Sequence, residues 1–112
     1  MTPHEPPPIE PYMLTIHPSG TYAYRKLTTV PTAEVLHEGG IEGPLEIVPL
    51  FRKLGLSPCI AFCDEDGRRK GLPPNRAAQA LWRLAVGRMI TEDHLVGPIV
   101  IVVGREAFLD RM

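Results

Sequence analysis

The sequence predicts an α+β domain with a small mixed, mainly antiparallel sheet and helices packed on one face of that sheet. Segments of strand length and strand composition are separated by short runs of proline, glycine and aspartate, which favour hairpin turns. Two further segments carry helix start and stop residues or helical spacing, which gives the element order ββαββαβ. The 112 residues are enough for one domain around one hydrophobic core.

The N-terminus differs in composition from the rest of the chain. Of the 13 prolines in the sequence, five precede Tyr12. Proline donates no backbone hydrogen bond and favours extended polyproline geometry, so a stretch rich in proline has little to fix it to a fold. We therefore expect a flexible tail at residues 1–11 and a single domain at residues 12–112.

The first half of the domain is expected to contain a hairpin, a short helix and a third strand. The strands are predicted at residues 12–17, 21–27 and 45–48, and the helix at residues 32–38. The first strand alternates in polarity, and Pro18-Ser19-Gly20 supplies the turn after which the chain returns as the second strand. The helix is expected to end at Gly39-Gly40, because glycine adopts the left-handed conformation that residues with a Cβ resist.

The second half is expected to contain two strands, the main helix and a short terminal helix or tail. The strands are predicted at residues 59–63 and 99–103, and the main helix begins after Pro73-Pro74 with Asn75 as its cap. One face of this helix would carry Ala77, Ala78, Leu81, Trp82, Leu84 and Ala85, and the other Arg76, Gln79 and Arg83. Five consecutive β-branched residues at 99–103 predict a central strand that is covered on both faces.

The run Asp64-Glu65-Asp66-Gly67 follows the fourth predicted strand and precedes Arg68-Arg69-Lys70. Asp-Gly is a strong short-range signal for a hairpin, because glycine accepts positive φ. A calcium loop needs spaced oxygen ligands before its glycine and a bidentate glutamate after it, whereas here the carboxylates are consecutive and basic residues follow. We therefore expect a solvated hairpin tip and no metal site.

Composition and reactive residues argue against several functional classes. The 12 basic and 13 acidic residues argue against a dedicated nucleic-acid binder, in which basic charge usually dominates. No stretch approaches the ~20 apolar residues that span a bilayer, so no membrane partner is expected. The histidines lack zinc-like spacing, neither serine lies in a nucleophile elbow, and no glycine-rich phosphate loop is present. The sequence therefore predicts a protein without catalytic residues, metal ligands or cofactor.

The two cysteines, Cys59 and Cys63, lie in one predicted strand. Residues four apart in a strand are about 13 Å apart, whereas a disulfide needs Cα atoms within roughly 7 Å. We expect both residues to be reduced apolar core residues of a cytoplasmic protein.

The candidate binding residues lie in the polar turn and in the entrance to the main helix. They are Asp64, Glu65, Asp66, Arg69, Lys70, Asn75 and Arg76. The turn is more polar than a tight Asp-Gly turn requires, and the free N–H groups at the start of the helix could receive an anion. A purely structural role is the alternative, in which Gly71 permits a tight bend and Asn75 caps the helix for ~1 kcal/mol.

Several of these motifs occur together in a known family. The matching segments are residues 39–40, 45–48, 64–67, 70–78 and 95–104, with Asp-Glu-x-Gly followed by Gly-Leu-Pro-x-Asn-Arg as the most specific combination. In this combination the chain resembles an uncharacterised family of phages and bacterial mobile elements that is known only as a domain of unknown function. The resemblance implies a phage origin and no assigned activity. Small phage proteins of this kind frequently bind a host protein, including components of defence systems.

The leading expectation is therefore a non-enzymatic phage accessory protein that binds a host macromolecule in the cytoplasm of the bacterial host. One alternative is a small-ligand or nucleotide-binding domain whose pocket uses residues 70–76. A weaker alternative is an unrecognised enzyme, because catalytic triads assemble from residues that are distant in sequence. The sequence leaves open whether the chain forms a homo-oligomer.

Overall fold

The computed structural model describes residues 10–87 and 93–112. Residues 1–9 of the expected tail lie outside the described residues. The described elements are β1 (Tyr12–Ile16), β2 (Tyr22–Lys26), α1 (Ala33–His37), β3 (Leu45–Ile47), β4 (Lys53–Leu54), β5 (Ser57–Asp64), α2 (Arg76–Val86), β6 (Ile99–Val103) and α3 (Glu106–Leu109). Within this part of the chain, no helix has the length and apolar character needed to cross a membrane.

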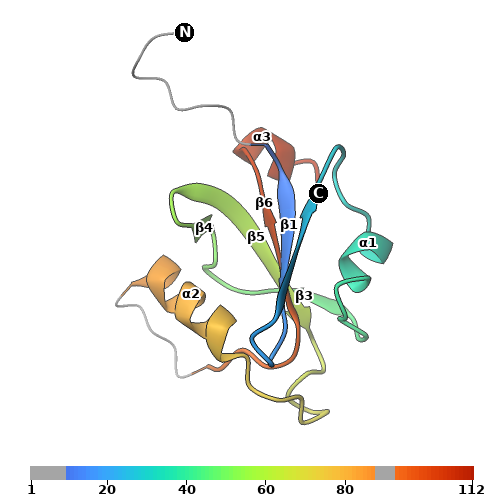
Figure 1. The fold of residues 1–112 in the computed structure, drawn as a ribbon, viewed down its shortest axis with the longest axis vertical. Coiled ribbons are helices and arrows are strands. Elements are labelled where there is room, and N and C mark those ends of the chain that lie inside the picture. The colour runs from blue at the N-terminus through green and yellow to red at the C-terminus, as the bar shows by residue number, and fades with distance from the viewer. Residues whose placement is uncertain (1–9, 88–92) are drawn as a thin grey trace, which may run out of the picture.

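The strands form a sheet of order β2-β1-β6-β5-β3, with β4 paired to β5 beside this path, and every pair of these strands is antiparallel (Figure 1). The last strand, β6, lies between β1 and β5 and therefore occupies the centre of the sheet. The α+β class and the mainly antiparallel sheet are thus confirmed. The short β4, which forms a hairpin with β5 around Gly55, was not among the predicted strands.

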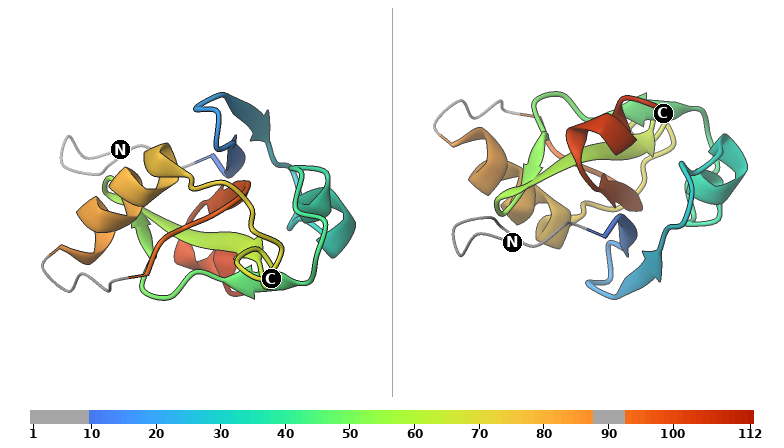
Figure 2. Two further views of the ribbon diagram at one scale, coloured as in Figure 1. Left: turned by 90° about the horizontal axis from the view of Figure 1, so that it is seen from below. Right: turned by 90° about the horizontal axis from the view of Figure 1, so that it is seen from above.

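Apolar residues cover the sheet on both faces. Ile99, Ile101 and Val103 of β6 pack in one cluster with Ala78 and Trp82 of α2. Val100 and Val102 pack in a second cluster with residues of α1 and α3. The helices therefore lie on two faces (Figure 2), and the expectation of helices on one face is wrong. The cause is β6 itself, because all five of its side chains are buried and alternate between the faces.

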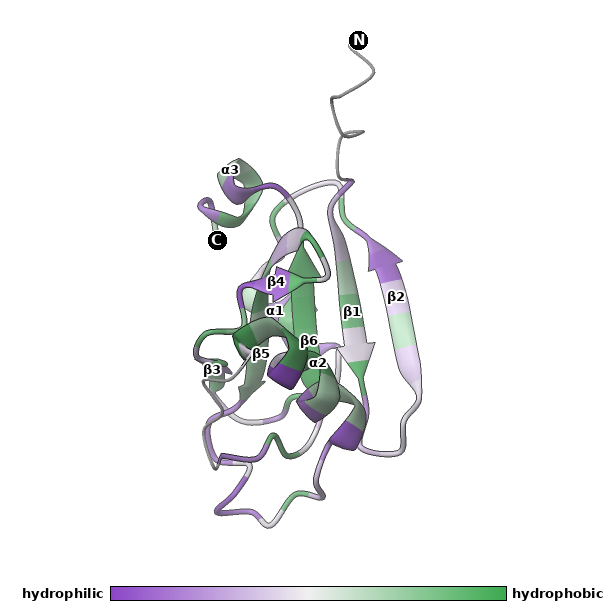
Figure 3. Cartoon of the chain, turned by 90° about the vertical axis from the view of Figure 1, so that its left-hand side faces the viewer, coloured by the Kyte–Doolittle hydropathy of each residue, from purple (hydrophilic) through white to green (hydrophobic). Residues whose placement is uncertain are grey.

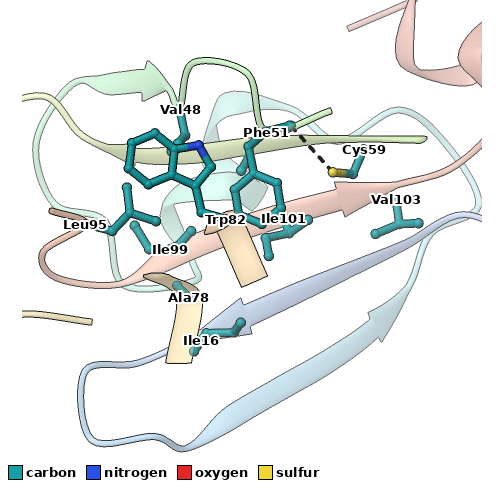
Figure 4. Packing of buried hydrophobic residues seen from close by; sticks show 11 residues of the cluster. Ile16, Val48, Phe51, Cys59, Ala78, Trp82, Leu95, Ile99, Ile101 and Val103 are labelled. Carbon is teal, nitrogen blue, oxygen red and sulfur yellow. Dashed lines mark hydrogen bonds between the residues drawn. The ribbon is translucent and has the colours of Figure 1, made fainter. Parts of the chain in front are cut away.

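The larger cluster is built around α2. Trp82 is buried against the sheet beside Phe51, Leu95 and Ile101 (Figure 4), and its Nε1–H donates to the carbonyl of Pro49 at 2.9 Å. Leu81 is half-buried against the same cluster, so the prediction that both residues pack on the sheet is confirmed.

Three residues of α2 lie on the opposite side from the prediction, and one of them is Ala77, which is exposed. Gln79 is 9% exposed, whereas Leu84 is 82% exposed. Gln79 is satisfied inside the protein, because its Oε1 accepts from the N–H of Leu95 at 2.7 Å and its Nε2 donates to the carbonyl of Asp93 at 3.2 Å.

The chain does not form a hairpin at the acidic turn. After β5 ends at Asp64, residues 65–71 form turns, and Pro74 then makes an isolated antiparallel bridge with Val96. α2 starts immediately afterwards. The Asp-Gly signal thus marks a turn, but the expected return strand is replaced by a connection that leads to the helix.

Candidate functional site

Asp64 is the first of the predicted site residues, and its side chain is only 1% exposed. The N–H of Asp66 donates to its Oδ1 at 2.8 Å, while the N–H of Gly43 and the Nζ of Lys70 donate to its Oδ2 at 3.2 and 2.8 Å. Burial by itself would raise the pKa of Asp64, but these hydrogen bonds outweigh it and hold the pKa below its ordinary value. The carboxylate therefore ties the turn to the loop before β3 and is not part of a solvated tip.

Asn75 is fully buried and joins three parts of the fold. Its Oδ1 accepts from the N–H of Ala78 at 3.1 Å, which caps α2 as predicted. Its Nδ2 donates to the carbonyl of Ile16 at 2.8 Å and to the carbonyl of Gly97 at 2.9 Å. All of these bonds lie within the protein, so the side chain is occupied in holding α2 to the end of β1 and to the segment before β6.

The other five predicted residues lie nearer the surface. Asp66 pairs with Arg69 at 3.1 Å, and Lys70 pairs with Asp64 at 2.8 Å. Glu65, Arg69 and Arg76 are exposed. The structure thus separates the predicted site into a buried scaffold of Asp64 and Asn75 and an exposed group that remains a prediction as a binding surface.

Two hollows adjoin this segment. The first has a volume of about 240 Å³ and lies between the end of β5 and residues 93–96, with Glu46, Cys63, Arg68 and His94 in its walls. The second has a volume of about 500 Å³ and is lined in part by Arg76, Arg83, His94 and Leu95. The second hollow is therefore bordered by two guanidinium groups and an imidazole.

The thiols are poor nucleophiles in this environment. Burial raises the pKa of Cys59 to about 11, although the charge of Lys53 lowers it slightly. Burial also raises the pKa of Cys63 to about 11, with a further contribution from the carboxylates of Glu46 and Asp64. Both cysteines are free, as expected, and both are thiols rather than thiolates at neutral pH. Among the described residues, no group of three or more His, Cys, Asp or Glu side chains is arranged to hold a metal ion.

The strand β2 is the most exposed element of the sheet. All five of its residues are exposed, and Tyr22 and Tyr24 are 74% and 56% exposed. Figure 3 shows β2 at the outer edge of the sheet, beside β1. Tyr24 lies with Tyr12 of β1 at a ring-centroid distance of 5.1 Å, so β1 and β2 together present an aromatic pair on the face that α2 covers further along the sheet.

The hydrogen-bond register fixes which backbone groups of β2 face outward. The N–H of His17 donates to the carbonyl of Thr21 at 2.9 Å, and the N–H of Leu27 donates to the carbonyl of Pro11 at 3.0 Å. Hydrogen-bonded pairs alternate along an antiparallel ladder, so Ala23 and Arg25 also point their backbone groups toward β1. The N–H and C=O groups of Tyr22, Tyr24 and Lys26 then point away from the sheet.

At the opposite edge of the sheet, the sequence of β3 disfavours pairing with a further strand. β3 has only three residues and lies between Pro44 and Pro49. The chain then turns at Leu50, whose φ of 63° is a left-handed conformation that residues other than glycine rarely adopt. Proline and short length are the usual means of protecting an edge strand. β2 contains no proline, so it is the more open of the two edges.

The sequence analysis did not select Tyr22 and Tyr24 as site residues. Their alternation marks them as residues on one face of a strand, but the exposure of that strand depends on its neighbours in the sheet. Here β6 pairs with the other side of β1 and leaves β2 at the edge. Nothing in the sequence near β2 indicates that this strand lies at the edge of the sheet.

Comparisons of the chain with protein-family models, with curated proteins and with solved structures gave no match.

Proposed function

We propose that this chain is a small phage accessory protein that acts by binding a host protein in the bacterial cytoplasm and has no catalytic activity. The observation that carries the proposal is the exposed edge strand β2 with Tyr22 and Tyr24. Exposed aromatic residues are enriched in protein interfaces, because they bury a large apolar area and keep a polar group for hydrogen bonding. The resemblance to a phage family supports the origin, and the raised pKa values of both thiols argue against cysteine catalysis.

A second candidate function is the binding of a small anionic ligand or nucleotide. The hollow of about 500 Å³ beside Arg76, Arg83 and His94 supports it. Its volume lies within the roughly 300–1,000 Å³ of small-molecule sites, and the arginine side chains suit phosphate or carboxylate groups.

Affinity capture from a bacterial host lysate tests the first proposal. The wild-type chain is expected to retain a specific host protein, and the double variant Y22S/Y24S is expected to lose it while the melting temperature changes little. The matched control is R69E/R76E, which reverses charge in the predicted segment and leaves β2 intact. Loss of capture by R69E/R76E alone would place the interface at residues 64–76 instead.

A thermal-shift screen of nucleotides and metabolites separates the two functions. A ligand that binds only the folded state raises the melting temperature by mass action. The host-protein proposal predicts no shift in this screen. A shift that disappears in an R76A/R83A variant, together with no captured protein, would replace it by the ligand-binding function.

A further inference from the structure

We infer that β2 receives an extended segment of the partner protein as an additional antiparallel strand, and that this segment carries an acidic residue opposite Lys26. The inference rests on the proposed function and adds the binding mode and the chemistry of the partner. It starts from the backbone of β2, where Tyr22, Tyr24 and Lys26 direct their N–H and C=O groups outward. These groups form the template that strand addition uses.

The side chains of the same three residues define the preferred sequence of the added strand. They lie on one face of the sheet, because they are paired with Ile16, Leu14 and Tyr12 of β1. Residues of the added strand directly opposite would point to this face as well. Apolar residues are favoured opposite the two tyrosines, which are exposed and would lose solvent-accessible area on contact.

The charge of Lys26, at the end of β2, determines which residue is preferred opposite it in the added strand. Arg25 points to the other face and is already paired with Glu38 at 2.7 Å. Lys26 has no ion pair with any residue that the structure describes. An acidic residue opposite Lys26 would supply that pair, and opposite charges across a strand pair are favourable by ~0.2–1 kcal/mol. An antiparallel partner would therefore read acidic–x–apolar–x–apolar from its N-terminal end.

A second copy of the chain fits this edge less well. Antiparallel pairing of two β2 strands about Tyr24 would place Lys26 opposite Tyr22 of the other copy, and Arg25 opposite Ala23. The strand contains no acidic residue, so a second β2 in this register would offer Lys26 no ion pair. The charge pattern thus favours a different protein as the source of the strand.

The experiment is a selection of short linear random peptides, displayed on yeast, against the immobilised full chain. Parallel selections use the variants Tyr24→Pro and Tyr24→Ala. Proline at this position removes an outward N–H and its ring obstructs an incoming strand, while the inward bonds of Ala23 and Arg25 to β1 are retained. Tyr24→Ala removes the same side chain and keeps the N–H. Thermal unfolding confirms that both variants are folded.

Peptides with the pattern acidic–x–apolar–x–apolar are expected to be enriched on the wild-type chain. They are expected to bind Tyr24→Pro at least about tenfold more weakly than Tyr24→Ala. Selection on Lys26→Glu, which preserves the backbone, is expected to exchange the acidic residue for a basic one. This charge exchange keeps the test decisive if Tyr24→Pro does not fold.

Three results of these experiments would overturn the inference, and a fourth comes from the affinity capture. One is the absence of enrichment on the wild-type chain, and another is enrichment without the alternating pattern or without a response to Lys26→Glu. The third is a dimer of the wild-type chain in sedimentation equilibrium that Tyr24→Ala retains and Tyr24→Pro loses, because β2 would then pair with a second copy. Capture of a host protein that depends on residues 64–76 would leave the proposed function in place and reject only strand addition.

Discussion

Replacing Asn75 by alanine is expected to lower the free energy of unfolding by about 3–5 kcal/mol. The substitution removes the cap of α2, which contributes ~1 kcal/mol, and leaves the buried carbonyls of Ile16 and Gly97 without the Nδ2 donor. Each lost bond costs roughly 0.5–1.5 kcal/mol, and a buried carbonyl that is left without any donor costs roughly 1–3 kcal/mol. Urea unfolding followed by tryptophan fluorescence measures the change, since Trp82 is the single tryptophan and is buried.

The matched control for this prediction is Thr32→Ala. Thr32 caps α1 by accepting from the N–H of Val35 at 3.3 Å, and among the described residues its side chain makes no second hydrogen bond. Its replacement is expected to cost only about 0.5–2 kcal/mol. Equal losses at Asn75 and Thr32 would show that the two buried bonds of Asn75 contribute little, and that its role is capping alone.

Replacing Trp82 by alanine is expected to lower the free energy of unfolding by about 3–5 kcal/mol. The indole is 3% exposed and packs with Phe51 and Ile101, so its removal leaves a large cavity and an unpaired carbonyl at Pro49. Circular dichroism in urea measures this change, because the variant lacks the fluorophore.

Leu84→Ala on the same helix serves as the control. Leu84 is 82% exposed, and its replacement is expected to change the free energy of unfolding by less than about 0.5 kcal/mol. A loss at Leu84 comparable with that at Trp82 would contradict the orientation of α2 described above.

Local sequence signals predicted the elements whose structure is set locally. The five residues of β6 were predicted with the observed bounds, and Asn75 was predicted as the cap of α2. Both rest on residue types whose preferences are strong: β-branched residues for a buried strand and asparagine for a helix start. The turn at Gly20, whose φ is 91°, is of the same kind.

Contacts between distant segments account for the parts that were wrong. The acidic turn looked solvated, but the N–H of Gly43 binds the Asp64 carboxylate from another loop. A Cβ at Gly43 would collide with that carboxylate, so the two positions depend on each other. Gln79 is polar by sequence, yet the segment that contains Leu95 supplies its partner and draws it inside. Neither contact has a signal within a few residues along the chain.

The candidate surface on β2 was hidden for a related reason. The strand was predicted, whereas its position at the edge results from the insertion of β6 between β1 and β5. Residues 64–76 drew attention through their charge, but two of the seven candidate residues, Asp64 and Asn75, serve buried bonds. The charged segment 64–76 therefore contains buried residues that hold the fold together as well as exposed residues that form a candidate surface.

Amide hydrogen exchange at β2, with the chain free and bound to its captured host protein, tests the central claim most directly. In the free chain the outward N–H groups of Tyr22, Tyr24 and Lys26 are expected to exchange rapidly, while those of Ala23 and Arg25 are protected by the ladder to β1. In the complex all five amides are expected to be protected. Unchanged rapid exchange at Tyr22, Tyr24 and Lys26, with new protection at residues 64–76, would contradict the claim that β2 is the binding edge.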